Sequence, residues 1–189
     1  MAVGVLLYLM RHGAAEDTAP TGRDSDRVLT SSGRATVERV ALSLKGMQTR
    51  PVAHIIASPF LRAQQTAEVV RRVLCPGVAI DTDEDLTPDG SAYDLAVRLG
   101  AAPQDTFLVG HQPNIEMVAR AIMGGSVRMP AVAPLAPGVG SSASRRPVPP
   151  PVPRLPPTFR TATVVAFEVV GRPPPYPLVL ALDPIALDG

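Results

Sequence analysis

Short apolar runs of strand length alternate with amphipathic stretches along most of the chain. The expected strands cover residues 6–10, 53–57, 78–81, 106–109, 161–170 and 178–182. The expected helices cover residues 30–46, 59–74, 93–99 and 114–123, where apolar residues recur at helical spacing. Strands that alternate with helices in this way predict an α/β fold. We therefore expect a three-layer sandwich, in which a mostly parallel central sheet carries helices on both faces.

Capping residues mark the ends of two of these helices. Thr30 is the expected N-cap of the first helix. Ser58 is expected to cap the second helix, with Pro59 in its first helical position. Cys75 precedes Pro76 and is expected to end that second helix as a small apolar residue. Because Cys75 is the only cysteine, the sequence excludes an intramolecular disulfide and a zinc site built on cysteines.

Length, charge and composition limit the number of domains and the kinds of partner that the chain is expected to have. The 189 residues are enough for one domain with a sizeable core. A formal net charge of +1 and an aromatic content of 4%, without tryptophan, favour neither nucleic acid nor a membrane surface as a partner. No apolar run reaches the length of a membrane span, and the first residues lack the basic region of a signal peptide. We therefore expect a cytoplasmic monomer.

One stretch departs from this pattern. Ten of the 22 prolines lie in residues 130–157, together with a segment rich in glycine, serine and alanine. Proline at this density is incompatible with a helix or a central strand. We expect a mobile loop with polyproline II character. Because a strand is expected beyond it at 161–170, the loop is interpreted as an insertion within a single domain that spans residues 1–189.

Polar and cationic residues follow three of the expected strands. Arg11 and His12 follow the first strand, Ser58 and Arg62 the second, and His111 the fourth. The carboxyl ends of parallel strands meet at one edge of a sheet, where α/β proteins bind their ligands. Arginine forks match phosphate oxygens, and Arg62 is expected in the first turn of its helix, where backbone amides also attract anions. The sequence predicts a phosphate site without a metal ion or cofactor, and Ser58 is a candidate phosphate contact as well as a candidate cap.

The histidines indicate what this site does to a phosphate. A neutral imidazole nitrogen of His12 can attack phosphorus and carry the phosphoryl group as a covalent intermediate. Arg11, Arg62 and a protonated His111 would offset the charge on the phosphoryl oxygens. The third histidine, His54, lies within an expected strand between apolar residues and is interpreted as structural or surface-exposed.

Five short motifs resemble those of the histidine phosphatase superfamily, a phosphoglycerate mutase-like group named for its Arg-His-Gly signature. The matching stretches are 10–13, 29–33, 58–66, 86–88 and 110–111, and they occur in the family's order. Within the superfamily, the chain most resembles the short SixA-type phosphohistidine phosphatases. The resemblance implies a phosphoglycerate mutase-like fold, with His12 as the phosphorylated nucleophile. It also implies that Arg11, Arg62 and His111 complete the phosphate pocket.

The chain departs from the larger family members at the proton donor. Those members carry an acidic residue after the third strand as proton donor, beside a helical insertion. Here that region is short, and Asp85 is the candidate donor, with Glu84 and Asp89 nearby. Phosphohistidine releases an imidazole, which departs more readily than an alkoxide and needs less help from an acid. The departure therefore favours phosphohistidine over phosphate esters as the substrate.

Together these features predict a phosphatase that hydrolyses phosphohistidine on a partner protein of the phosphorelay or phosphotransferase-system type. A short chain without a capping insertion leaves the pocket open, as a protein substrate requires. Two alternatives stay open. The first is a phosphatase for a small-molecule phosphomonoester, and the second is a non-catalytic module that binds phosphate for recognition.

Overall fold

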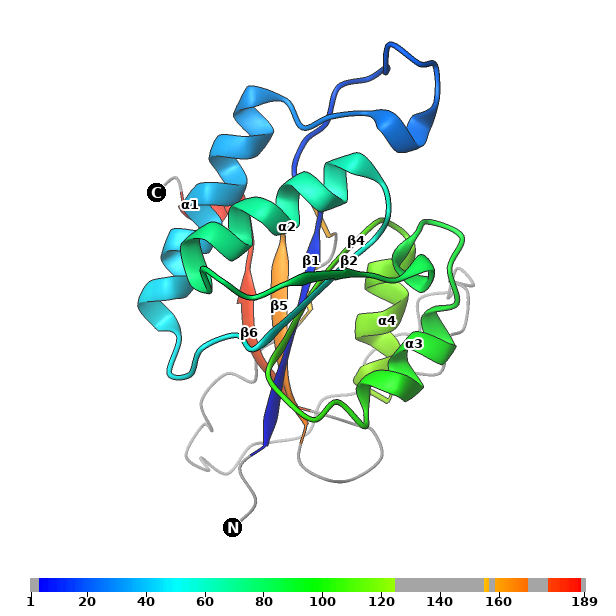
Figure 1. Cartoon of the computed structure of the whole chain (residues 1–189). Coiled ribbons are helices and arrows are strands. Elements are labelled where there is room, and N and C mark those ends of the chain that lie inside the picture. The colour runs from blue at the N-terminus through cyan, green and yellow to red at the C-terminus, as the bar shows by residue number, and fades with distance from the viewer. Residues whose placement is uncertain (1–3, 125–154, 157–158, 170–176, 188–189) are drawn as a thin grey trace, which may run out of the picture.

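A six-stranded sheet with helices on both faces forms the molecule (Figure 1). The computed structural model describes residues 4–124, 155–156, 159–169 and 177–187. The Pro-rich insertion expected at 130–157 lies outside these residues, except for Leu155 and Pro156, and its mobility stays a prediction. Within the described ranges, no helix is both long enough and apolar enough to cross a membrane.

The sheet has the strand order β3-β2-β4-β1-β5-β6. Its strands are β1 (Val5–Arg11), β2 (His54–Ala57), β3 (Ile80–Thr82), β4 (Thr106–Gly110), β5 (Val164–Val169) and β6 (Leu178–Leu182). The first four strands run parallel to one another, whereas β5 is antiparallel to β1 and β6 is antiparallel to β5. The predicted mostly parallel sheet is therefore confirmed, with β6 at one edge.

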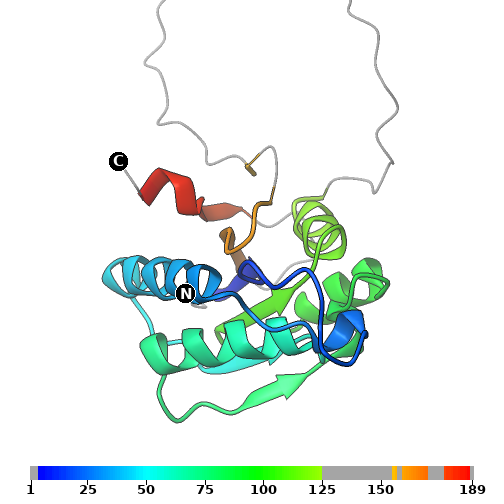
Figure 2. The same cartoon turned by 90° about the horizontal axis from the view of Figure 1, so that it is seen from above.

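Four helices cover the two faces of this sheet, as Figure 2 shows. They are α1 (Ser31–Met47), α2 (Leu61–Leu74), α3 (Ala92–Leu99) and α4 (Asn114–Ile122). Along β1 the side chains alternate between the faces: Tyr8 and Met10 pack in the core beneath α1 and α2, and Leu7 and Leu9 in the core beneath α3 and α4. The two cores confirm the predicted three layers.

The helix ends agree with the sequence in part. The Thr30 hydroxyl accepts a hydrogen bond from the Gly33 N–H at 2.9 Å, which confirms Thr30 as the N-cap of α1. Cys75 is the buried C-cap residue of α2. The prediction that Ser58 caps α2 was wrong, because α2 begins at Leu61 and Phe60 holds the N-cap position without a side-chain hydrogen bond. The Ser58 hydroxyl is used elsewhere, as described below.

Two strands begin later than predicted because tight turns precede them. The third strand begins at Ile80, after a turn in which Gly77 has a φ of 101°. The fifth begins at Val164, because Ala162 adopts a φ of 64°, in the left-handed region. The Ala162 N–H donates to the backbone carbonyls of both Arg11 and His12. The turn before β5 therefore holds the end of β1 in place.

Candidate active site

The carboxyl ends of β1, β2 and β4 bring the predicted site residues to one edge of the sheet. Arg11 lies opposite Gly110 in the register of β1 and β4. The His12 N–H donates to the Gly110 carbonyl at 3.0 Å, and the Ser58 N–H donates to the Val109 carbonyl at 3.0 Å. The residues that follow these three strands are therefore neighbours, as the parallel topology predicted.

His12 is held in one tautomer by its own backbone. Its Nδ1 lies 2.7 Å from the Gly13 carbonyl oxygen. A carbonyl only accepts hydrogen bonds, so in the neutral ring Nδ1 carries the proton and Nε2 keeps its lone pair. The Arg62 Nε–H donates to that Nε2 at 3.3 Å. Burial, with the charges of Arg62 and Arg11, outweighs the Gly13 hydrogen bond and lowers the pKa of His12 to about 4. His12 is therefore uncharged at neutral pH and keeps a lone pair on Nε2.

Gly13 and Thr66 fix the position of the loop that carries His12. The Gly13 N–H donates to the Thr66 hydroxyl at 3.1 Å, and that hydroxyl donates to the Arg62 carbonyl at 2.7 Å. A Cβ at position 13 would lie 2.7 Å from Cγ2 of Val37 and 3.0 Å from the Gly33 carbonyl. A glycine is therefore required where the chain after His12 passes under α1. Thr66 is fully buried and positions the loop rather than lining an open pocket.

His111 lies against His12 and is also neutral. The two rings have centroids 4.8 Å apart, and the Phe60 ring meets His111 edge-on at 4.9 Å. Burial, together with the proximity of His12 and Arg62, lowers the pKa of His111 to about 3. The ring is neutral because His111 is 1% exposed and lies near cations. The expectation of a protonated His111 concerned the ring beside a phosphoryl group, and it stays a prediction.

The Ser58 hydroxyl forms a hydrogen bond with His111. Its oxygen lies 2.9 Å from Nε2 of His111 and also accepts a long hydrogen bond, 3.3 Å, from the Phe60 N–H. Ser58 itself is fully buried. The hydroxyl therefore orients the His111 ring through Nε2, and Nδ1 is the ring nitrogen that can bind another partner.

Two buried nitrogens of the site have no hydrogen-bond partner among the described residues. They are Nε of Arg11 and Nδ1 of His111. The Arg11 guanidinium also donates from Nη1 to the Phe159 carbonyl at 2.8 Å, and burial followed by the Arg62 charge lowers its pKa. Leaving buried polar atoms unpaired costs free energy, which an anion with several acceptor oxygens would recover. Both atoms are thus suited to hold a phosphoryl group.

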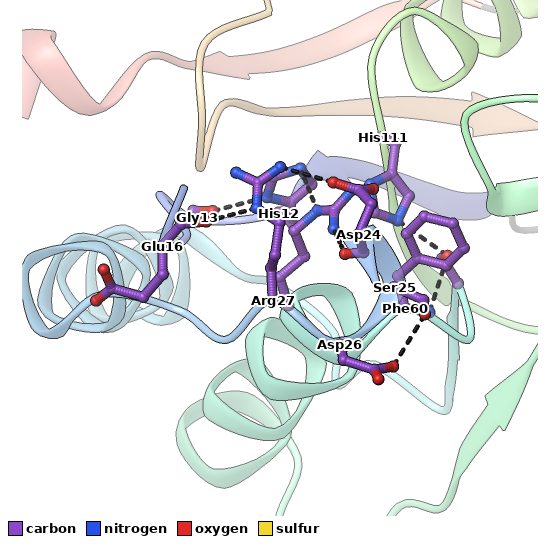
Figure 3. A network of polar contacts seen from close by, with 11 residues as sticks. His12, Gly13, Glu16, Asp24, Ser25, Asp26, Arg27, Phe60 and His111 are labelled. Atoms are coloured by element: carbon purple, nitrogen blue, oxygen red, sulfur yellow. Dashed lines mark hydrogen bonds and ion pairs between the residues drawn. The ribbon is translucent and has the colours of Figure 1, made fainter. Parts of the chain in front are cut away.

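Arg62 is bound by a residue that the sequence did not point to. Its Nη1 donates to the Asp24 backbone carbonyl at 2.6 Å, and its Nη2 donates to Oδ2 of the same residue at 2.8 Å. Asp24 opens the short 3-10 turn η1 (Asp24–Asp26), and its Oδ1 accepts from Arg27 Nη1 at 2.7 Å. Figure 3 shows Asp24 and Arg27 gathered beside His12 and His111. The hydrogen bonds from Arg27 and Arg62 lower the pKa of the Asp24 carboxyl, so it is ionised.

Residues 14–27 are a polar stretch between the first expected strand and the first expected helix, with Pro20 and Gly22 in it. Charged residues in such a stretch carry no periodic signal, so Asp24 and Arg27 could not be distinguished from Asp17 or Arg23 nearby. Only the folded loop brings the Asp24 carboxylate to Arg62.

Asp85, the candidate proton donor, is bound by Arg98 and by the Ser91 backbone. Its Oδ2 accepts from Arg98 Nη1 at 2.6 Å, and its Oδ1 accepts from the Ser91 N–H at 3.1 Å. These contacts, the Arg98 hydrogen bond above all, lower the pKa of the Asp85 carboxyl. A general acid needs a raised pKa, so the structure argues against Asp85 in this role.

His54, the third histidine, lies away from the site residues. His54 is the first residue of β2, at the opposite end of the strand from Ser58, and its Nε2 lies 2.8 Å from Asp81 Oδ2. This contact agrees with a surface role. In the part of the chain that the structure describes, no group of three or more histidine, cysteine, aspartate or glutamate side chains is arranged to hold a metal ion.

Known proteins resemble the chain in sequence. Residues 7–87 match a family model described as the histidine phosphatase superfamily (branch 1). Over 123 residues the chain is 37% identical to an uncharacterized protein of Picosynechococcus sp., which covers 63% of this chain and 73% of that protein. Over 114 residues it is 32% identical to the phosphohistidine phosphatase SixA of Escherichia coli, which covers 58% of this chain and 68% of that protein.

Solved structures resemble the chain in fold. A structure of the protein histidine phosphatase SixA complexed with tungstate matches with a TM-score of 0.73 at 23% identity, over 97% of this chain and 99% of that one. A phosphoglycerate mutase from Plasmodium falciparum matches with a TM-score of 0.52 at 16% identity, over 67% of this chain and 73% of that one. The predicted phosphoglycerate mutase-like fold is therefore confirmed.

Proposed function

The chain belongs to the histidine phosphatase superfamily (branch 1), and on this premise we propose that it hydrolyses phosphohistidine on a partner protein. The proposed route is a covalent intermediate on His12. The single observation that carries it is the state of His12: a neutral ring whose Nδ1 is bound to the Gly13 carbonyl, and whose Nε2 lone pair faces the Arg62 guanidinium.

The proposed reaction has two displacement steps. In the first, the Nε2 lone pair of His12 attacks phosphorus, and the bond from phosphorus to the substrate nitrogen breaks with its electron pair on that nitrogen. In the second, water attacks the phosphoryl group on Nε2. The Nε2–phosphorus bond then breaks, its electrons return to the ring, and the water proton passes to the departing inorganic phosphate.

Three side chains would balance the phosphoryl charge. Nε of Arg11 and Nδ1 of His111 are buried atoms without partners among the described residues, and Arg62 already points its Nε–H at the nucleophile. A phosphoryl dianion beside His111 would favour the charged ring, which burial disfavours. His111 would thus gain its proton on substrate binding and not before it.

The choice of phosphohistidine rests on the leaving group. The two carboxyls singled out near the site, Asp24 and Asp85, both have lowered pKa values and are bound by arginines. Neither is a ready proton donor for an alkoxide, whereas an imidazole leaves with less assistance. The 32% identity to a phosphohistidine phosphatase supports the same substrate.

Turnover of two substrates separates this proposal from its alternatives. We expect the purified protein to dephosphorylate a radiolabelled phosphohistidine peptide faster than an aryl phosphate. We expect His12→Ala to abolish turnover, while His54→Ala, the matched histidine outside the site, retains it. Rapid turnover of phosphate esters with none of phosphohistidine would favour a small-molecule phosphatase. Phosphate binding without turnover of either substrate would favour a recognition module.

Trapping the intermediate tests the chemistry directly. During turnover, an alkaline quench should preserve label on His12 and an acid quench should destroy it, because phosphohistidine is acid-labile. Acid-stable label on a serine or threonine would refute the proposed route. A screen of phosphorelay and phosphotransferase-system proteins would then identify the partner class.

A further inference from the structure

The proposed phosphate site includes an anion of its own, the Asp24 carboxylate, which is bound to Arg62. Arg62 is buried, with its side chain 6% exposed, whereas the Asp24 side chain is 57% exposed. Two of the three Arg62 nitrogens are bound by Asp24, through the backbone carbonyl and Oδ2. A buried charge is costly without a partner, so this carboxylate stabilises Arg62 in the empty site.

A bound phosphoryl group would put a second anion on the same guanidinium. Arg62 donates from Nε to His12 Nε2, which is the atom proposed to attack phosphorus. The Nε edge of Arg62 therefore faces the phosphoryl position, while the Nη1 and Nη2 nitrogens are taken by Asp24. Two anions on one guanidinium repel each other and divide its attraction.

The turn that carries Asp24 is anchored outside the core. None of the residues of η1 is buried. Its side chains form polar contacts. Arg27 donates a hydrogen bond to Asp24, and the Thr21 and Ser25 hydroxyls donate to Asp26. The carboxylate is thus supplied by a surface turn that contacts the site through Arg62, and its charge can be removed without disturbing the packed layers.

We propose that Asp24 is an internal counter-ion of Arg62 that weakens the pocket's hold on free phosphate and so speeds release of the product. This inference rests on the proposed function, because free phosphate is the product only if the site hydrolyses a phosphoryl group. A protein-bound phosphohistidine has further contacts to supply binding, whereas inorganic phosphate depends on the pocket alone. Asp24 would thus select for a phosphoryl group that is attached to a larger substrate.

Binding of inorganic phosphate to the whole protein, measured by calorimetry without any turnover, tests the inference. We expect Asp24→Asn to bind phosphate about tenfold more tightly than wild type, because one neighbouring negative charge is lost. Asp26→Asn is the matched control. It removes the same charge from the same turn but has no contact with Arg62, and we expect its affinity to stay within about twofold of wild type.

The direction of the change decides the outcome. Unchanged or weaker phosphate binding in Asp24→Asn, with wild-type binding measurable, overturns the inference and leaves the proposed function standing. A weaker affinity in Asp24→Ala would likewise mean that Asp24 only orients Arg62. If neither wild type nor Asp24→Asn binds phosphate, both the inference and the phosphate pocket fail. In turnover assays, inhibition by phosphate should strengthen in Asp24→Asn and not in Asp26→Asn.

Discussion

His12 and His111 are buried in the folded protein and are uncharged there at neutral pH. Their pKa values lie at about 4 and about 3, mainly because burial disfavours the charged rings, and nearby arginines add to the effect. An exposed histidine titrates near pH 6.5. The same burial that keeps the His12 lone pair available therefore couples the stability of the fold to pH.

The sign of this coupling follows from the proton count. Below about pH 6.5 the unfolded chain binds protons on both histidines, while the folded chain does so only near pH 4 and 3. Stability is thus complete above about pH 6.5 and falls as the pH drops toward 4. We expect a loss of about 1.4 kcal/mol per pH unit for each histidine across this window.

Urea unfolding at pH 7 and pH 5 measures this loss, because most carboxyls stay ionised over that interval. The double variant His12→Gln with His111→Gln should lose most of the difference between the two pH values. His54→Gln should keep it, since His54 is half-exposed and lies outside the site. An equal pH dependence in the double variant and wild type would contradict the prediction.

At the scale of elements, α1 packs closely against the loop that follows β1 and carries His12. A Cβ at Gly33 would lie 2.1 Å from the Ala14 carbonyl oxygen, which is a backbone atom with little freedom to move. A Cβ at Gly13 would likewise lie 2.7 Å from Cγ2 of Val37, which belongs to the same helix. The contact of α1 with the loop after β1 thus depends on two glycines, one from each side.

Gly33→Ala should destabilise the fold, because α1 must move away from the loop. We expect a loss of about 1–3 kcal/mol, as for other overpacked sites. Gly46→Ala is the matched control, since Gly46 lies in the same helix with nothing within 4 Å of its added Cβ. That control should gain about 0.5–1 kcal/mol from the better helix former. Denaturant midpoints give both values, and equal effects would refute the steric argument.

At the scale of the whole molecule, the segment after the Pro-rich insertion is part of the site. The Phe159 carbonyl accepts from Arg11, and the Ala162 N–H donates to the carbonyls of Arg11 and His12. Phe159 is itself fully buried in the core beneath α3 and α4. The strands β5 and β6, which follow the Pro-rich stretch in the sequence, thus belong to the same sheet as β1.

The insertion itself can be tested by removal. Deleting Pro134 to Pro153 should leave the melting temperature within a few degrees and the turnover of a small substrate unchanged. The physical reason is that a proline-dense segment adds neither a helix nor a central strand to the core. The measurements are thermal unfolding and a turnover assay beside wild type. A large loss of activity on the small substrate would mean that the insertion belongs to the site.

Local pattern and topology were enough to predict which residues meet. Each of Arg11, His12, Ser58 and His111 comes just after or at the end of a strand, and Arg62 lies in the first turn of α2. Parallel strands end at one edge of a sheet, so the order of elements along the chain places these side chains together. Apolar periodicity and the position of a residue after its strand can both be recognised in the sequence alone.

Only the tertiary structure decided how these residues are charged and bound. The neutral state of His111 depends on burial, and burial is set by packing between distant segments. Asp24 and Asp85 lie in short turns, which carry no periodic signal in the sequence. Only the folded structure shows that they bind Arg62 of α2 and Arg98 of α3. The sequence by itself determined the layers of the fold and which residues meet at the carboxyl ends of the strands. The folded loops decided which carboxylate lies among those residues.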